Sequence, residues 1–218
     1  MTPQAREQPI VVTAGRVKLP GILGLPSSAT GLVVFAHGSG SGRHSPRNMF
    51  VARTLRDGNL ATLLIDLLEE EEAEDRRKVF DIALLADRLL AATEWLSHHE
   101  ETAGLRLGYF GASTGAGAAL QASARSPASV GAVVSRGGRP DLASVYLPDV
   151  MAPTLLIVGG HDLPVIEMNQ EALALLTCPK ELVIVPGATH LFEERGTLEQ
   201  VADLALRWFL RHLNRPGS

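Results

Sequence analysis

The stretch Leu107-Gly-Tyr-Phe-Gly-Ala-Ser-Thr-Gly-Ala-Gly-Ala-Ala-Leu120 decides the fold of this 218-residue chain. It contains a G-x-S-x-G pattern at 111–115, centred on Ser113. An apolar, strand-like segment (105–110) precedes the pattern, and small residues compatible with a helix (116–124) follow it. A sharp strand-to-helix turn presents a serine hydroxyl at the edge of a sheet, and the glycines leave room for the neighbouring elements. The stretch predicts a nucleophilic serine, although a glycine-rich turn with an incidental serine has the same pattern.

Outward from this turn, strand-like and helix-like segments alternate along the chain. The strand-like runs are continuously apolar, which is typical of parallel strands covered on both faces. This alternation indicates a doubly wound α/β fold, and two segments around Gly15 predict an N-terminal antiparallel hairpin. Expected strands lie at 11–13, 19–25, 32–36, 61–65, 105–110, 130–135, 154–158 and 181–185, and expected helices at 48–57, 77–98, 114–125, 141–147, 164–176 and 197–213. Short connections leave no room for a sizeable lid, so we expect one domain over 1–218, with residues 1–9 flexible.

The composition is that of a globular protein, with 45% hydrophobic and 20% charged residues. A net charge of −4 gives no electrostatic footprint for nucleic acid. One cysteine, Cys178, excludes an intramolecular disulfide, fits a reducing compartment and is expected to be structural. The N-terminal residues lack the apolar core of a signal peptide, and no apolar run has the length of a membrane span. We therefore expect a cytoplasmic monomer or homodimer without cofactor, nucleic-acid partner or membrane partner.

The run from Glu69 to Asp75 is the one unusual charge block, and basic residues follow it at 76–78. Such a block is compatible with a metal or cationic-ligand site. We favour a solvated loop, because its acidic residues lead into the start of the 77–98 helix, where negative charge is stabilising. No metal site is predicted.

A serine nucleophile needs a general base, which an acid must orient. In one common arrangement the three follow along the chain as serine, acid and histidine. Downstream of Ser113 the histidines are His161, His190 and His212. His190 lies between the last strand and the last helix, where the base belongs, although a loop histidine without a role is the alternative. His212 falls in the last turn of the last helix and is expected to be exposed.

The acid is expected just beyond the end of a strand. Asp162 follows the 154–158 strand after two glycines. The alternative is that it only caps the helix that begins at Pro164, and both roles are compatible if its backbone caps while its side chain meets His190. Its main rival, Asp141, comes after the preceding strand and is interpreted more simply as a helix cap or first-turn acid.

An oxyanion needs backbone N–H donors aimed at it in advance. One candidate is the amide of Thr114, directly after the nucleophile. The other comes from the loop His37-Gly-Ser-Gly-Ser-Gly42, with Ser39 as first choice and Gly40 as the alternative. This loop lacks the glycine spacing and the lysine of nucleotide-binding motifs. His37 is expected to tie the loop to its surroundings.

Two arginine-containing loops, 43–48 and 135–140, should lie at the carboxyl ends of strands, where α/β proteins bind ligands. Arg43 and Arg136 are candidates to receive an anionic substrate group, and Gly40 is a further candidate for substrate contact. The alternative is that both arginines pair with local acids.

Together these features resemble the α/β-hydrolase superfamily, and the small size without a lid resembles its dienelactone-hydrolase-like branch. The resemblance covers nearly the whole chain and implies a three-layer α/β-hydrolase fold. It implies a triad of Ser113, Asp162 and His190, with the Ser39 and Thr114 amides as oxyanion donors. Dienelactone hydrolases proper carry a cysteine nucleophile, so Ser113 implies an ordinary serine esterase.

The leading functional hypothesis is therefore a carboxylic-ester hydrolase that acts on small esters through an acyl-enzyme. Since no insertion could shape a deep tunnel, short-chain or compact substrates are expected. Thioester hydrolysis or acyl transfer on the same triad is an alternative. A non-catalytic binding module on the same scaffold is another, and the complete set of triad residue types argues against it.

Overall fold

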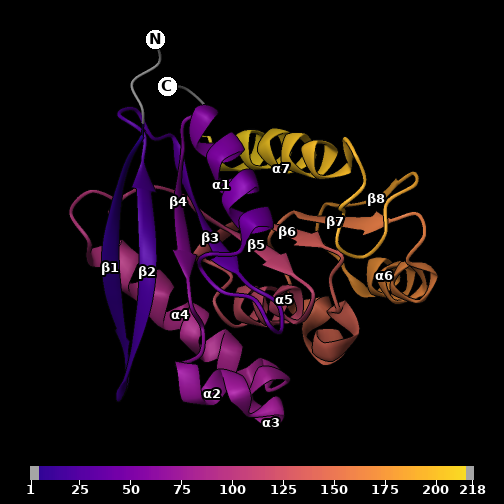
Figure 1. The fold of residues 1–218 in the computed structure, drawn as a ribbon, viewed down its shortest axis with the longest axis horizontal. Coiled ribbons are helices and arrows are strands. Elements are labelled where there is room, and N and C mark those ends of the chain that lie inside the picture. The colour runs from indigo at the N-terminus through magenta and orange to yellow at the C-terminus, as the bar shows by residue number, and fades with distance from the viewer. Residues whose placement is uncertain (1–4, 215–218) are drawn as a thin grey trace.

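A mostly parallel sheet of eight strands organises the structure, a computed structural model that describes residues 5–214 (Figure 1). The strand order is β1-β2-β4-β3-β5-β6-β7-β8. The strands are β1 (Arg6–Ala14), β2 (Val17–Leu25), β3 (Gly31–Ala36), β4 (Leu60–Ile65), β5 (Leu107–Ala112), β6 (Val130–Arg136), β7 (Thr154–Gly159) and β8 (Lys180–Val185). Strands β3 to β8 pair in parallel, so their carboxyl ends share one edge of the sheet. The predicted α/β fold is confirmed.

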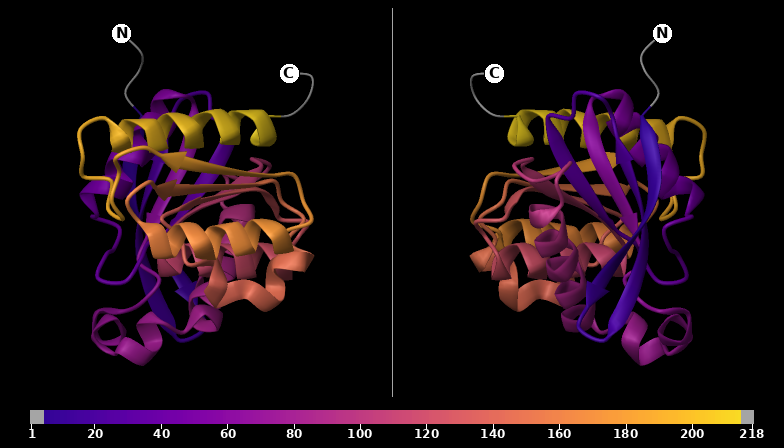
Figure 2. Two further views of the ribbon diagram at one scale, coloured as in Figure 1. Left: turned by 90° about the vertical axis from the view of Figure 1, so that its right-hand side faces the viewer. Right: turned by 90° about the vertical axis from the view of Figure 1, so that its left-hand side faces the viewer.

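Helices cover both faces of the sheet. They are α1 (Pro46–Asp57), α2 (Glu70–Glu74), α3 (Arg76–Val79), α4 (Ile82–His98), α5 (Thr114–Arg125), the 3₁₀ helix η1 (Pro140–Asp149), α6 (Leu163–Leu175) and α7 (Thr197–Leu213). Helices α1 and α7 pack together on one face, and α4, α5 and α6 lie on the other (Figures 1 and 2). Within the described part of the chain, no helix combines the length and apolar character needed to cross a membrane.

The N-terminal hairpin is longer than expected. Strand β1 pairs antiparallel with β2 from Arg6 opposite Leu25 to Ala14 opposite Val17. Residues 6–9, which the sequence suggested were flexible, belong to this ladder. Their side chains are mostly polar because β1 is an edge strand, so no apolar run marks them. Residues 1–4, also part of that expectation, lie outside the described residues.

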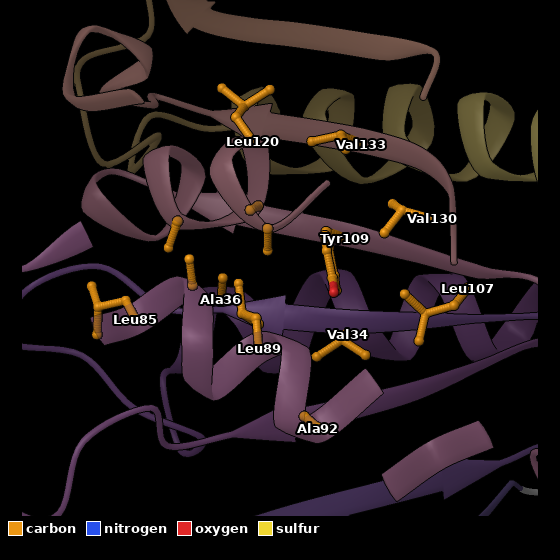
Figure 3. Packing of buried hydrophobic residues seen from close by; sticks show 14 of the residues in the cluster. Val34, Ala36, Leu85, Leu89, Ala92, Leu107, Tyr109, Leu120, Val130 and Val133 are labelled. Carbon is orange, nitrogen blue, oxygen red and sulfur yellow. The ribbon is translucent and has the colours of Figure 1, made fainter. Parts of the chain in front are cut away.

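The core consists of two apolar layers, one on each side of the sheet. Figure 3 shows the layer beneath α4 and α5, where Leu85 and Leu89 of α4 face Val34 and Tyr109 of the sheet. The other layer packs α1 and α7 against the opposite side of the same strands. Burial of the sheet on both faces explains why its strands are continuously apolar in sequence.

Helix α7 approaches the sheet closely through glycines on three strands. A Cβ atom on Gly108 would lie 2.7 Å from the ring of Phe209. On Gly31 or Gly131 it would lie 2.9 Å from the side chain of Leu213. These strands therefore accept the large side chains of α7 only because they lack side chains at these positions.

The segment around the acidic run differs from expectation. The run is solvated as expected, with no buried residue in it, but it is a helix rather than a loop: it forms α2, which begins with a capping box between Glu69 and Glu72. Glu72 also pairs with Lys78 at 3.0 Å and with Arg88 at 3.3 Å, which anchors the run. The expected 77–98 helix is interrupted, because the carboxylate of Asp81 accepts the Leu84 N–H at 3.0 Å and begins α4 as a new helix.

Candidate active site

Ser113 occupies a one-residue turn between β5 and α5. Its backbone angles, φ 51° and ψ −123°, lie where a residue with a side chain is strained. The carbonyl of Ser113 accepts the N–H of Arg139 at 3.1 Å, and its own N–H donates to the Arg136 carbonyl at 3.3 Å. The turn is therefore held by the segment that follows β6.

The two glycines of the G-x-S-x-G pattern are required by close backbone contacts. A Cβ atom on Gly115 would lie 2.2 Å from the carbonyl oxygen of Ala36, at the end of β3. A Cβ atom on Gly111 would lie 2.4 Å from Cα of Ala116. Both distances are far below van der Waals contact, which confirms that the pattern makes room for the neighbouring strand and helix.

The structure brings His190 and Asp162 together. Nδ1 of His190 lies 2.6 Å from Oδ2 of Asp162, with side chains 39% and 14% exposed, respectively. Asp162 is the N-cap of α6 through its backbone, since its carbonyl accepts the Ile166 N–H at 2.9 Å, but its side chain caps nothing. The carboxylate is thus free to hold the imidazole, and a donating Nδ1 leaves Nε2 available as a base.

The loop that carries His190 packs on the loops after β6 and β7. The His161 N–H donates to the Ala188 carbonyl at 2.9 Å, and a Cβ atom on Gly159 would lie 2.5 Å from that same carbonyl. A Cβ atom on Gly137 would lie 3.5 Å from Nδ1 of His190. His190 and Ser113 therefore both border residues 136–139. The two side chains share no hydrogen bond in the described structure, and such catalytic bonds commonly tighten only when substrate binds.

Asp141 and His212, the two other polar residues considered from the sequence, both contact neighbouring side chains. Asp141 accepts two hydrogen bonds from Arg139, at 2.8 and 2.7 Å, in the first turn of η1, as its interpretation as a first-turn acid predicts. His212 is half-buried rather than exposed, because its ring lies 4.5 Å from that of Trp208, one helical turn earlier. The expectation of an exposed His212 was wrong.

The glycine-rich loop after β3 lies against Ser113. A Cβ atom on Gly38 would lie 2.9 Å from Cβ of Ser113. Beyond it, Gly40 has a φ of +67°, which turns the chain at the candidate donors Ser39 and Gly40. Thr114 is the first residue of α5, where helix N–H groups have no intrahelical acceptor.

His37 ties this loop to the end of β4, as expected. The Leu67 N–H donates to Nε2 of His37 at 2.9 Å, and Nδ1 lies 3.0 Å from the Gly38 carbonyl. Burial lowers the pKa of His37, so the ring is neutral at physiological pH.

The two candidate arginines have different surroundings. Arg43 forms an ion pair with Asp66, whose other oxygen accepts the Arg43 backbone N–H at 2.5 Å. Arg136 is buried, and its Nε and Nη1 atoms have no acceptor among the described residues. Its Cζ atom lies 5.9 Å from the centre of the Phe192 ring. Arg43 thus pairs with a local acid, whereas Arg136 does not.

Sequence reasoning overlooked Arg47 and Phe192 as neighbours of the site. Arg47 follows Pro46 in the first turn of α1, and its position just after the glycine-rich loop is a signal that could have identified it. Phe192 has a φ of 55°, which no local pattern predicts.

The order of the strands, the strained serine turn and the histidine loop together place the protein in the α/β-hydrolase class. Within that class the chain belongs to the dienelactone hydrolase family, whose model matches residues 23–213.

Among its relatives is a Mycobacterium tuberculosis H37Rv protein with the provisional name of a phosphoribosyl transferase. It is 58% identical over 99% of this chain, but the match covers 48% of that protein. The chain therefore spans about half the length of this curated relative.

Two solved structures show how the fold is shared. A crystal structure named as a dienelactone hydrolase of Anabaena variabilis has a TM-score of 0.95 and 59% identity, covering 97% of this chain and 100% of that one. The protein Est1E of Butyrivibrio proteoclasticus has a TM-score of 0.80 at 16% identity, covering 93% of this chain and 98% of that one. The second likeness concerns the fold alone.

Proposed function

We propose that this chain hydrolyses carboxylic esters through an acyl-enzyme on Ser113. The observation that carries the proposal is the 2.6 Å contact between His190 Nδ1 and Asp162, beside the strained serine turn. Membership in the dienelactone hydrolase family supports it.

In the proposed reaction, Ser113 Oγ attacks the ester carbonyl while Nε2 of His190 takes its proton. Asp162 fixes the imidazole tautomer and stabilises the imidazolium that forms. The negative oxygen of the tetrahedral intermediate accepts hydrogen bonds from the backbone N–H groups of Thr114 and Ser39. His190 then returns the proton to the departing alcohol. A water molecule, deprotonated by His190, then attacks the acyl-enzyme. As the Ser113 Oγ–acyl bond breaks, His190 returns this proton to Oγ, and the carboxylic acid leaves.

The test combines turnover and covalent labelling. The parent should hydrolyse para-nitrophenyl esters and react with a fluorophosphonate probe, whereas Ser113→Ala should lose several orders of magnitude in turnover and all labelling. Ser129→Ala is a matched control, because Ser129 is exposed just before β6, at the opposite edge of the sheet. Labelling that persists in Ser113→Ala would refute the assignment of the nucleophile.

A further inference from the structure

The guanidinium of Arg136 is a buried cation without a counter-charge. The residue is 8% exposed, and neither Nε nor Nη1 finds an acceptor among the residues that the structure describes. Burial, with the nearby charge of Arg47, lowers the pKa of Arg136 to about 10, so it remains protonated at neutral pH. An unpaired buried charge destabilises a fold. Its presence here therefore points to a ligand.

A second arginine lies beside it. Arg47 stands in the first turn of α1, and its Nε atom is also buried without an acceptor in the described chain. Its Nη1 atom binds Oε1 of Glu193 at 3.2 Å, with the Glu193 side chain 64% exposed. A pair with so exposed a carboxylate is weak, so an anionic ligand can displace Glu193 at little cost.

The two arginines lie next to the proposed catalytic residues. Arg136 ends β6, and its carbonyl accepts the Ser113 N–H at 3.3 Å. Its guanidinium faces Phe192, two residues beyond His190, and Glu193 follows Phe192 directly. A group bound to these arginines would therefore lie under the histidine loop, beside the position of the reacting ester.

We infer that Arg136 and Arg47 bind a phosphate group of the ester substrate. This inference rests on the proposed function and names its substrate class: small esters that carry a phosphomonoester. Three unpaired guanidinium nitrogens and two positive charges match the three terminal oxygens and the charge of nearly −2 of a phosphomonoester. A carboxylate offers two oxygens, so it would leave one of these three nitrogens without an acceptor.

The first experiment measures binding without turnover. Inorganic phosphate should raise the Tm of the parent with a concentration dependence that follows mass action, whereas acetate at equal ionic strength should not. Arg136→Gln should abolish the rise, and Arg47→Gln, at a half-buried position, should reduce it. Arg125→Gln is the charge-matched control, since Arg125 ends α5 and pairs with Asp87. An equal rise in the parent and Arg136→Gln, or no rise in the parent, would overturn the site.

The second experiment compares three para-nitrophenyl esters of one acyl length, ending in a methyl, a carboxylate or a phosphonate group. The parent should favour the phosphonate over the methyl ester by at least about tenfold in kcat/KM, as charge-assisted hydrogen bonds imply. In Arg136→Gln that ratio should fall toward one. An equal or greater preference for the carboxylate ester would overturn the phosphate assignment. If no ester is hydrolysed, the proposed function fails, while the phosphate-dependent Tm still decides whether the anion site exists.

Discussion

Asp162 has two structural roles. Its backbone carbonyl caps α6, and its carboxylate lies within hydrogen-bond distance of Nδ1 of His190. Asp162→Asn should therefore lower ester turnover by roughly four orders of magnitude, because an amide at this position favours the wrong imidazole tautomer. Helix α6 should persist, since its cap does not use the side chain. Steady-state kinetics on a short-chain ester, with circular dichroism on the same sample, would measure both effects.

Asp141→Asn provides the comparison, because Asp141 forms a two-bond pair with Arg139, whereas the described partner of His190 is Asp162. It should affect mainly stability. Near-normal turnover in Asp162→Asn, together with lost turnover in a folded Asp141→Asn, would move the acid to the loop after β6.

His37 makes stability depend on pH. Burial lowers its pKa in the folded state, so the unfolded chain binds the proton more readily once the pH falls below the ordinary value of 6.5. The contribution of neutral, buried His37 to the free energy of unfolding is therefore fully present above pH 6.5. It is lost as the pH falls through the lowered pKa that His37 has in the folded protein. Tm measured from neutral to mildly acidic pH should fall, and His37→Gln should flatten the curve.

His212 contributes in the same direction, because burial also lowers its pKa. His212→Gln should therefore remove a second part of the slope, whereas the same change at the exposed His98 serves as the control. An unaltered slope in the His37→Gln variant would contradict the account.

Among the elements, α4 and β5 are joined by one buried polar contact. Thr93 Oγ1 donates to the Leu89 carbonyl at 2.9 Å and lies 2.6 Å from the hydroxyl of Tyr109. Burial raises the pKa of Tyr109 to about 12, so this hydroxyl stays protonated and donates. Thr93→Val should cost about 1–3 kcal/mol of unfolding free energy, because it leaves the Tyr109 hydroxyl without an acceptor.

A double-mutant cycle in urea measures the coupling. Tyr109→Phe removes the stranded hydroxyl, so the Thr93→Val/Tyr109→Phe double variant should lose less stability than the two single changes added together. Strict additivity would show that the two side chains do not depend on each other.

Local signals predicted some elements better than others. The expected helices at 114–125 and 197–213 agree with α5 and α7, since their sequence patterns are local. The acidic run is solvated as expected, but its helix was missed, and so were the ion pairs of Glu72 with Lys78 and Arg88 that anchor it. Such pairs depend on how α2, α3 and α4 pack, which periodicity does not reveal.

The candidate site likewise has features that the sequence predicts and features that it does not. The serine turn and the positions of Asp162 and His190 follow from strand ends and chain order, which the sequence displays. The difference between Arg43, paired with Asp66, and Arg136, buried beside Phe192, arises from contacts between distant segments. Both arginines looked alike in sequence, and only the folded chain separates them.

For the whole molecule, the short connections between elements lead us to expect a preference for compact acyl groups. The kcat/KM of the parent toward para-nitrophenyl esters should fall as the acyl chain lengthens past a few carbons, because residues 5–214 contain no long insertion that could enclose it. A series of esters with graded acyl length measures this directly. A clear preference for long chains, or activation at a lipid–water interface, would contradict the prediction.

The three strand glycines beneath α7 also affect the order in which the core forms during synthesis. The side chains nearest to these three glycine positions are those of Phe209 and Leu213, and both residues lie in α7. During synthesis the eight strands leave the ribosome before α7, while α1 is already available to pack on the same face of the sheet. The part of that face beneath α7 therefore stays uncovered until residues 197–213 have been synthesised.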